Sequence, residues 1–334
     1  MTDIALGQRP SSIRVYPAAI LLGAVALLFG IGAGYGWFGE SRDWLNYRNV
    51  WDQLPSRFDV SVSRFERGYV WTSWFAKYEL QADFNLYYAV LATSSLAIKF
   101  RLLWKYAEAP VIAAIVYLML LYPLHEYTQI RAAIGFAFAY LGLDACLEGK
   151  LGSGVLLFAL GALFHTTVVA VALSLLVVFA LRNRPPAVAG GVLSLLAGVS
   201  AIAIPYLVDT LEKANPLARS YIETASVNGA PNIFSGETIL LFSVIVSSMV
   251  LLRPWRRSPD SSTFLLGAWS LIWLVAMARV PTFAFRLEEA FIFPLLLFTF
   301  RFDETLRSRV PALLMIATGV WMFYESLSLG VIGT

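Results

Sequence analysis

Long apolar runs separated by short polar segments make up most of the chain, a pattern typical of membrane-spanning helices. A helix needs roughly 20 apolar residues to cross a bilayer, and shorter runs are half-spans or interior helices. The pattern predicts helices over residues 17–38, 84–100, 109–124, 130–147, 151–164, 166–181, 187–208, 237–252, 262–280, 286–300 and 310–329. We therefore expect an all-α polytopic membrane protein with about 10–11 transmembrane or re-entrant helices, folded as a single domain over residues 1–334.

Composition supports this class, because 58% of the residues are hydrophobic, only 14% are charged, and the mean hydropathy is +0.68. The net charge of +3 comes from loops, so we expect no nucleic-acid partner. The single cysteine, Cys146, excludes a disulfide within one chain. The two histidines lie far apart and lack zinc-site spacing, so we expect no metal and no cofactor.

Basic residues indicate the orientation of the spans. The first apolar run follows Arg9 and Arg14, is too long for a signal peptide and precedes no small-residue cleavage site. We therefore expect an uncleaved first span and a cytoplasmic N-terminus. The alternation of spans then places further basic residues on the same side, as short cytoplasmic loops require: Lys99, Arg101, Lys105, Lys150, Arg182, Arg184, Arg253, Arg256, Arg257, Arg301, Arg307 and Arg309.

The apolar run over residues 151–181 is too long for one comfortable span and too short for two. Lys150 and Arg182 flank it, and both are expected on the cytoplasmic side, so the run is predicted to form a hairpin of two short helices. A fourteen-residue arm covers about 21 Å of a ~30 Å hydrocarbon core. His165, at the apex, would then lie in a recess below the outer surface. It is either a structural histidine bonded to a neighbouring carbonyl or a functional group.

Two long loops are expected on the outer side. The first, residues 39–82, mixes aromatic and basic residues and suits short helices at the membrane interface, with six aromatics as candidates for the lipid-facing side: Phe65, Tyr69, Trp71, Trp74, Phe75 and Tyr78. Its basic residues either attract anionic head groups or include one or two that bind a lipid-linked phosphate. The second loop, residues 206–236, contains Lys213, Arg219 and Tyr221 and a stretch rich in Gly, Pro and Asn.

This topology gathers ionisable residues at the outer ends of the spans. Such groups are expensive at membrane depth and are functional candidates by default. A single arginine can extend its head group to the interface. Several at one depth, together with a histidine and carboxylates, indicate a site. The set comprises Asp43, Glu66, Glu126, Arg131, His165, Arg279 and Arg286.

Short motifs in a fixed order run from Asp43 to about Pro294. They are D-x-x-x-Y (Asp43, Tyr47), E-x-G-Y (Glu66, Gly68, Tyr69), I-R-x-x-I-G (Ile130, Arg131, Ile134, Gly135), L-F-H-x-[ST] (Leu163, Phe164, His165, Thr167) and R-L-x-x-x-F (Arg286, Leu287, Phe291). In these motifs the chain resembles the EpsG-type, Wzy-like polysaccharide polymerases of bacterial membranes. It departs from them at Ala132, where glutamine is common, and at Ala290, where tyrosine is common.

The resemblance implies that a growing glycan on undecaprenyl pyrophosphate is transferred to a lipid-linked repeat unit, on the outer face of the bacterial inner membrane. Arg131 and Arg286, then Arg279, would bind the pyrophosphate as its charge builds. The base would be His165, Asp43 or Glu66, and His165 could equally donate a hydrogen bond to the pyrophosphate. Glycan contacts are expected from Tyr47, Tyr69, Arg219 and Tyr221. Membrane lipids and a chain-length regulator are the other expected partners.

Three alternatives share parts of this pattern. A polyprenyl-phosphate-dependent glycosyltransferase would add single sugars and use Asp43 as its base. A ligase would move a finished glycan to another acceptor by the same arginine and histidine chemistry. A transporter or flippase would bind near the bilayer midplane between repeated halves, whereas these charges are expected near one surface and the sequence shows no repeat.

Overall fold

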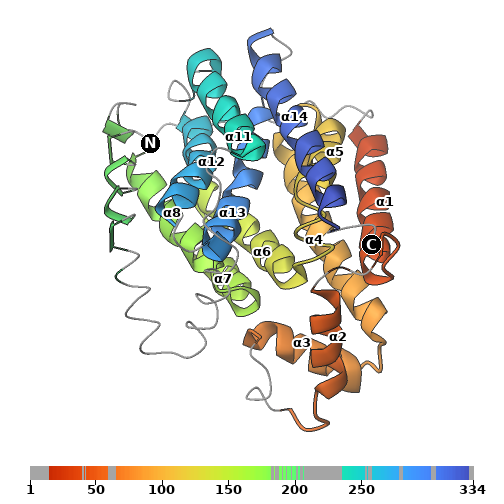
Figure 1. Ribbon diagram of the computed structural model, residues 1–334. Helices are drawn as coiled ribbons and strands as arrows, with labels where there is room; N and C mark the ends of the chain where they lie inside the picture. Colours follow the sequence, from red (N-terminus) through yellow and green to blue (C-terminus); the bar gives the residue numbers. More distant parts are fainter. Residues whose placement is uncertain are drawn as a thin grey trace.

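The computed structural model describes residues 15–39, 41, 43–58, 65–181, 184, 188–189, 191–192, 194–196, 198–200, 202–203, 206, 235–252, 254, 258–277, 281–301 and 306–330. These residues form helices and turns, with no strand among them (Figure 1). The elements are α1 (Val15–Gly34), α2 (Trp44–Gln53), α3 (Arg67–Tyr78), α4 (Phe84–Tyr106), α5 (Pro110–Leu120), α6 (Ile130–Leu147), α7 (Leu151–Phe164), α8 (Val168–Leu181), α11 (Gly236–Ser247), the π-helix η2 (Ser248–Leu252), α12 (Ser258–Ala276), α13 (Pro281–Thr299) and α14 (Leu306–Ser328).

Four of these helices are long and apolar enough to cross a bilayer, over Pro17–Gly34, Phe84–Tyr106, Ile130–Leu147 and Arg307–Ser328. Five shorter apolar helices accompany them, over Pro110–Leu120, Leu151–Phe164, Val168–Leu181, Gly236–Leu252 and Ser262–Leu274. Large apolar side chains such as Leu156, Leu176 and Leu313 are exposed on the outside of the bundle, as a lipid environment favours. The predicted all-α polytopic class is confirmed.

The two ends of the bundle differ in character. α2 and α3 lie together at one end, which we call the α3 end (Figure 1). The opposite end carries Lys105, whose Nζ lies 2.6 Å from Asp144 Oδ1 and 2.5 Å from Glu148 Oε1, and Lys150, whose Nζ lies 2.7 Å from Glu148 Oε2. The basic residues that the sequence placed on one side therefore include two that meet at one end.

The predicted hairpin is present, since α7 ends at Phe164, α8 begins at Val168, and His165 lies at the break. Other boundaries moved. α5 ends at Leu120 instead of 124, because Pro123 has no N–H to continue the helix. α13 begins at Pro281, five residues before the predicted start. The predicted span 187–208 and the outer loop 206–236 lie largely outside the described residues.

The prediction that Lys99 lies in a cytoplasmic loop is wrong. α4 continues to Tyr106, so Lys99 sits inside the bundle with 0% of its side chain exposed. Its Nζ donates to Glu126 Oε1 at 2.6 Å and to the hydroxyl of Tyr117 at 2.8 Å. A lysine at the end of an apolar run is typical of the boundary of a span, but Lys99 pairs with a carboxylate inside the bundle.

The loop predicted over residues 39–82 contains two short helices, as expected. α2 and α3 pack together, since Lys77 Nζ donates to the carbonyl of Trp51 at 2.6 Å and Tyr78 donates to that of Leu54 at 2.5 Å. Of the six aromatics predicted to face lipid, Trp71 and Phe75 are exposed. Tyr69 is 1% exposed, so its placement on the lipid side was wrong. Tyr69 precedes Trp71 by two residues and therefore lies on the opposite face of α3, where it packs among rings of α2 and α4.

Candidate functional site

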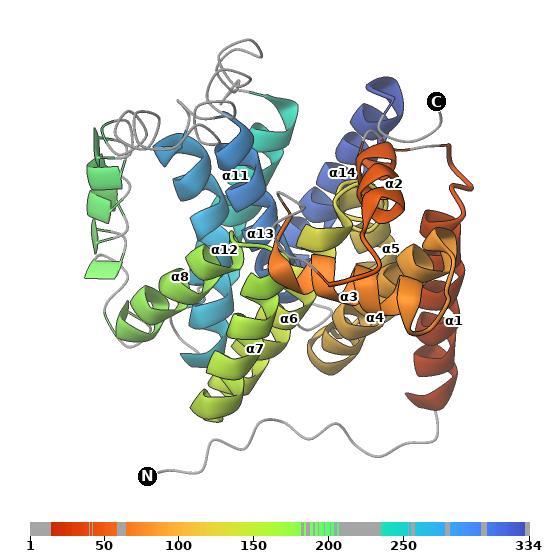
Figure 2. The same ribbon diagram turned by 90° about the horizontal axis from the view of Figure 1, so that it is seen from below.

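Two glycines let the helices of the α3 end approach one another closely. A Cβ on Gly68, in the first turn of α3, would lie 2.7 Å from the carbonyl oxygen of Leu163 at the end of α7. A Cβ on Gly135 of α6 would lie 2.9 Å from the Cβ of His165. Figure 2 shows α3 crossing near α6 and α7 at this end. The glycines of two sequence motifs therefore bring Glu66, which caps α3, beside His165.

Glu66 connects Arg131 to His165. Its Oε2 atom forms an ion pair with Nη1 of Arg131, and its Oε1 atom lies 3.3 Å from Nδ1 of His165. The backbone N–H of Thr166 also points at Oε1, at 3.5 Å. The side chains of Glu66, Arg131 and His165 are 16%, 13% and 5% exposed. Residues from α3, α6 and the hairpin apex thus meet at one buried point.

Aromatic rings support the Arg131 guanidinium. Its Cζ atom lies 4.0 Å from the ring centroid of Phe65 and 5.7 Å from that of Tyr47. The Tyr47 and Tyr69 rings are 5.4 Å apart, and Phe65 lies 5.4 Å from Tyr47. An arginine stacked in this way is fixed in orientation while N–H groups that are not paired with Glu66, such as Nε, can bind an anion.

Several buried polar atoms at this site have no hydrogen-bond partner among the described residues. They include Nε of Arg131, both ring nitrogens of His165, the hydroxyl of Tyr69 and Oγ1 of Thr167. Buried polar groups are almost always paired, and each unpaired one costs about 1–3 kcal/mol. So many in one place indicate that water or a polar ligand binds among them.

Electrostatics fixes the charge of Glu66. Burial raises the pKa of its carboxyl group, but the contact with His165 and the charge of Arg131 outweigh burial and lower the pKa to about 2. The carboxylate is therefore ionised at neutral pH. It is better suited to holding Arg131 and His165 than to taking up a proton.

Arg286 and Asp43 lie close enough to act on the same tyrosine. Burial raises the pKa of Tyr47, the charges of Arg131 and Arg286 oppose the rise, and that of Asp43 adds to it. The charge of Arg286 also reaches His165. Asp43 caps α2 one turn before Tyr47 and lies 3.5 Å from the Asn46 amide.

Of the ten predicted site residues, the structure brings five into direct contact, with Arg286 and Asp43 nearby. The five are Tyr47, Glu66, Tyr69, Arg131 and His165. The remaining three, Arg279, Arg219 and Tyr221, lie outside the described residues.

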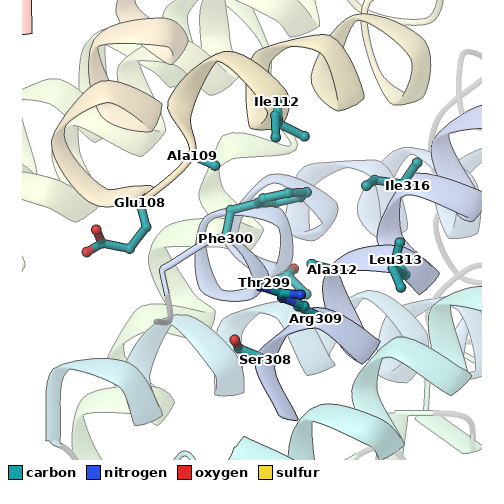
Figure 3. A pocket seen from close by; sticks show the side chains of 10 residues that line it. All are labelled: Glu108, Ala109, Ile112, Thr299, Phe300, Ser308, Arg309, Ala312, Leu313 and Ile316. Carbon is teal, nitrogen blue, oxygen red and sulfur yellow. The ribbon is translucent and has the colours of Figure 1, made fainter. Parts of the chain in front are cut away.

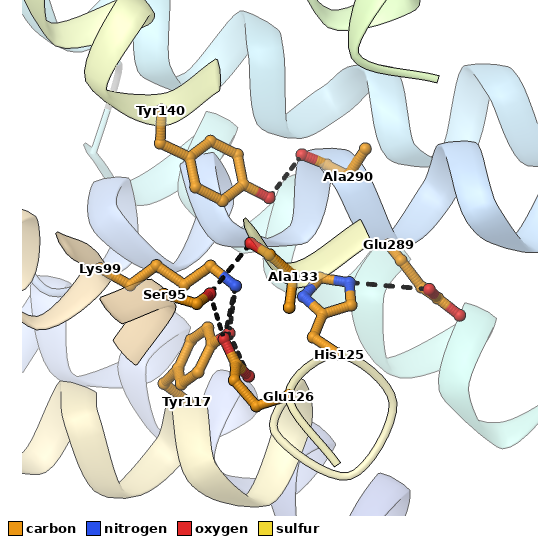
Figure 4. Close-up of polar contacts among 9 residues, drawn as sticks. All are labelled: Ser95, Lys99, Tyr117, His125, Glu126, Ala133, Tyr140, Glu289 and Ala290. Carbon is orange, nitrogen blue, oxygen red and sulfur yellow. Dashed lines mark hydrogen bonds and ion pairs between the residues drawn. The ribbon is translucent and has the colours of Figure 1, made fainter. Parts of the chain in front are cut away.

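A second polar centre next to this site is only partly anticipated by the sequence (Figure 4). The turns after α5 carry His125 and Glu126, both 0% exposed. Nε2 of His125 lies 3.6 Å from Oε2 of Glu289 on α13, while Glu126 accepts hydrogen bonds from Lys99, Tyr117 and Ser95. In the sequence, this centre could have been found from the pair of glutamates at 288 and 289, which follow Arg286 in a mainly apolar helix.

Phe136 joins the two centres. Its ring centroid lies 5.7 Å from that of His165 and 5.4 Å from that of His125. The two imidazoles therefore both contact one buried ring. The two polar centres of the α3 end are therefore neighbours that share the ring of Phe136.

The structure also contains a pocket of about 550 Å³ far from these groups (Figure 3). It lies between α5, the end of α13 and α14, and is lined by Glu108, Ala109, Ile112, Thr299, Phe300, Ser308, Arg309, Ala312, Leu313 and Ile316. Along α13, Phe300 is about 20 Å from Arg286 at 1.5 Å per residue. Its mainly apolar lining lacks the grouped charges of the α3 end.

Among the residues that the structure describes, no group of three or more His, Cys, Asp or Glu side chains is arranged to hold a metal ion. The chemistry available at the α3 end is that of two arginines, two histidines and carboxylates in a buried, aromatic-lined interior. Such a set binds an anion and moves a proton.

Comparison with known proteins identifies the family. No curated protein matches the chain, and no solved structure matches it. The model of the EpsG family matches residues 19–329, nearly the whole chain, and the motif residues of the α3 end lie within that range. The chain is a multi-pass membrane protein that belongs to the EpsG family, whose members are Wzy-like polysaccharide polymerases.

Proposed function

We propose that this protein extends a polysaccharide by transferring the growing glycan from undecaprenyl pyrophosphate to the free end of a lipid-linked repeat unit. The reaction takes place at the α3 end, which we assign to the periplasmic face of the bacterial inner membrane, with the N-terminus cytoplasmic. The observation that carries the proposal is the contact of Glu66 with both Arg131 and His165 in a buried, aromatic-lined cluster.

Arg131 is positioned for the leaving group. A guanidinium has five N–H donors, and the ion pair with Glu66 occupies one side of the fork. Its Nε has no partner among the described residues, so donors remain for a pyrophosphate. Charge builds on that leaving group as the glycosidic bond breaks. Donors already held in place stabilise the charge without reorganisation.

Arg286 supplies the second positive charge, since it acts on the same Tyr47 and His165 as Arg131 does. Two cations match a diphosphate better than one, and Arg279, seven residues before Arg286 in the sequence, is the proposed third. His165 completes this side of the site as a hydrogen-bond donor to the pyrophosphate. Glu66 positions both partners.

The aromatic wall and the long loops are assigned to the glycan. Tyr47 and Tyr69 line the cluster, and Arg219 and Tyr221 are proposed to contact the sugar chain. Membrane lipids surround the apolar outer faces, and a chain-length regulator is a proposed partner. The donor sugar is already activated by its bond to pyrophosphate, a good leaving group, so no nucleotide sugar is required.

A purified preparation tests this function. The protein is incubated with one defined undecaprenyl-pyrophosphate-linked repeat unit, and the products are separated by size. We expect a ladder with the unaltered protein and no long products with Arg131→Ala or Arg286→Ala, both still folded and inserted. Arg57→Ala, which changes an exposed arginine between α2 and α3, is the matched control and should keep the ladder.

The same assay separates the alternatives. A single transfer product instead of a ladder would indicate a ligase. An Asp43→Asn variant that loses all transfer while His165→Ala keeps it would indicate a single-sugar glycosyltransferase. Normal chain lengths in both arginine variants would contradict the proposed pyrophosphate site.

A further inference from the structure

His125 and Glu289 form a buried pair whose polar atoms have no hydrogen bonds of the kind that a purely structural role would provide. Both ring nitrogens of His125 and Oε2 of Glu289 lack a hydrogen bond to any described residue. Their 3.6 Å separation is longer than a hydrogen bond, and their side chains are 0% and 10% exposed. A structural histidine or glutamate in a lipid-embedded bundle would be paired, because unpaired polar groups there are costly.

The backbone around His125 is built to hold it in the interior. Residues 121–128 form turns instead of helix, and they are almost entirely buried. The neighbouring Glu126 is tied to Lys99 at 2.6 Å, and Thr128 donates to the carbonyl of Pro123 at 2.8 Å. Irregular backbone at membrane depth is tolerated where it is enclosed by protein or lines a polar cavity.

Glu289 is held with similar care. Pro294 of α13 has no N–H, so the carbonyl of Ala290 loses its usual donor four residues ahead. The hydroxyl of Tyr140 on α6 fills that position at 3.0 Å (Figure 4). The Tyr140 and Phe293 rings also stack, with their centroids 4.5 Å apart. These contacts fix α13 against α6 next to Glu289.

Glu289 also shares a helix face with a pyrophosphate ligand of the proposed site. Residues three apart in a helix lie on the same face, so Arg286 and Glu289 of α13 face the same region. The positive charge of Arg286 is close enough to act on the Glu289 carboxyl group. Glu289 therefore lies beside the cations that bind the leaving group, and its unpaired oxygen can contact the second substrate.

We propose that Glu289, with His125 beside it, takes the proton from the acceptor hydroxyl of the lipid-linked repeat unit. The inference rests on the proposed function. The acceptor oxygen forms a bond to the anomeric carbon, the bond from that carbon to the pyrophosphate oxygen breaks, and the electron pair leaves with the lipid pyrophosphate. The hydroxyl proton passes to the Glu289 carboxylate, while His125 orients that carboxylate.

In this assignment, the two polar centres of the α3 end have different roles. Glu66 is committed to Arg131 and His165 and serves the pyrophosphate side. The acceptor side belongs to His125 and Glu289, and His125 contacts the same Phe136 ring as His165. A glycan polymerase needs two lipid-linked substrates at once, and two polar centres in one interior provide for both.

Glu289→Gln tests the proposal, because it keeps the shape of the side chain and removes its basicity. We expect transfer to fall at least 100-fold, the usual contribution of a general base. Binding of undecaprenyl pyrophosphate to the purified protein should stay within about threefold of the unaltered protein. Glu289→Asp should recover part of the rate. His125→Gln should lower the rate less than Glu289→Gln.

Glu288→Gln is the matched control, since it makes the same change at an adjacent carboxyl that is 1% exposed and also has an oxygen without a partner among the described residues, whereas the ion-pair contact of His125 is with Glu289. It should keep transfer within about threefold. Full transfer by Glu289→Gln, or an equal loss in both variants, would overturn the proposal. If the unaltered protein forms no ladder and binds no undecaprenyl pyrophosphate, the proposed function itself fails, which is a distinct result.

Discussion

Gly68 packs directly against the carbonyl group of Leu163, so that a Cβ at residue 68 would lie 2.7 Å from the carbonyl oxygen. This contact joins the start of α3 to the end of α7, two residues from Glu66 on one side and two from His165 on the other. Because the obstacle is backbone, neither helix can yield by a side-chain rotation.

Gly68→Ala should therefore move α3 away from α7 and separate Glu66 from His165. We expect at least a tenfold loss of long-chain product, with helix content by circular dichroism unchanged. Gly152→Ala is the control, because a Cβ there meets nothing within 4 Å and alanine favours the helix by about 0.5–1 kcal/mol. Unchanged product lengths in Gly68→Ala would show that the close approach is not needed.

Arg131→Lys keeps the charge but should not keep the function. A lysine ammonium is a point charge without the planar fork, so it cannot hold Glu66 and a pyrophosphate side by side. We expect at least a tenfold drop in transfer and weaker binding of undecaprenyl pyrophosphate. Arg48→Lys changes an arginine whose side chain is 42% exposed and should behave like the unaltered protein. Equal binding by both variants would argue against Arg131 as the phosphate ligand.

The sequence located the first centre because charge is conspicuous in apolar surroundings. Arg131 and His165 interrupt apolar runs, and helix spacing with a consistent topology placed both at one end. The break at His165 followed from run length and flanking charges alone. The contact of Glu66 with both residues did not follow, because it depends on how the two glycines let three helices approach.

The second centre was hidden for a different reason. Pairing of His125 with Glu289 requires residues 121–128 to leave the helix and turn inward, whereas the apolar pattern continued α5 to residue 124. Lys99 was read as a loop cation because it ends an apolar run. In sequence alone, a lysine buried against Glu126 cannot be distinguished from one exposed at a membrane surface, because the difference depends on the three-dimensional position of Glu126.

That buried pair makes a prediction about stability. Removing one member leaves an uncompensated charge in the interior, which costs about 3–5 kcal/mol. Lys99→Met and Glu126→Gln should therefore each lower the midpoint of thermal unfolding in detergent. The double variant should lose less than the sum of the two, because neither charge is then left alone. Additive losses in a double-mutant cycle would contradict a direct interaction.

The pH dependence follows from Glu66. Its pKa is about 2 in the folded protein and about 4.5 when unperturbed, so its contribution to stability is complete above about pH 4.5 and is lost as the pH falls toward 2. The Glu66→Gln variant should thus show a smaller loss of stability over that range than the unaltered protein. Unfolding midpoints measured at intervals from pH 6 to pH 2.5 provide the comparison. Parallel curves for the two proteins would exclude this titration.

Tyr140→Phe tests the contact that holds α13 in place. Pro294 has no N–H to donate to the carbonyl of Ala290, and the Tyr140 hydroxyl replaces that donor at 3.0 Å. Without the hydroxyl, the carbonyl has no hydrogen-bond donor. An unpaired buried carbonyl costs about 1–3 kcal/mol, so the unfolding midpoint should fall. Transfer should fall as well if α13 carries Glu289 to the acceptor.

Tyr324→Phe removes the same atom from a tyrosine that is 66% exposed and should alter neither property. Adding Pro294→Ala to Tyr140→Phe restores a backbone N–H four residues after Ala290, so the carbonyl regains a helical partner and part of the lost stability should return. Recovery in the double variant would assign the effect to that carbonyl. A double variant less stable than Tyr140→Phe would instead show that the proline-bent shape of α13, and not the unpaired oxygen, is what the bundle requires.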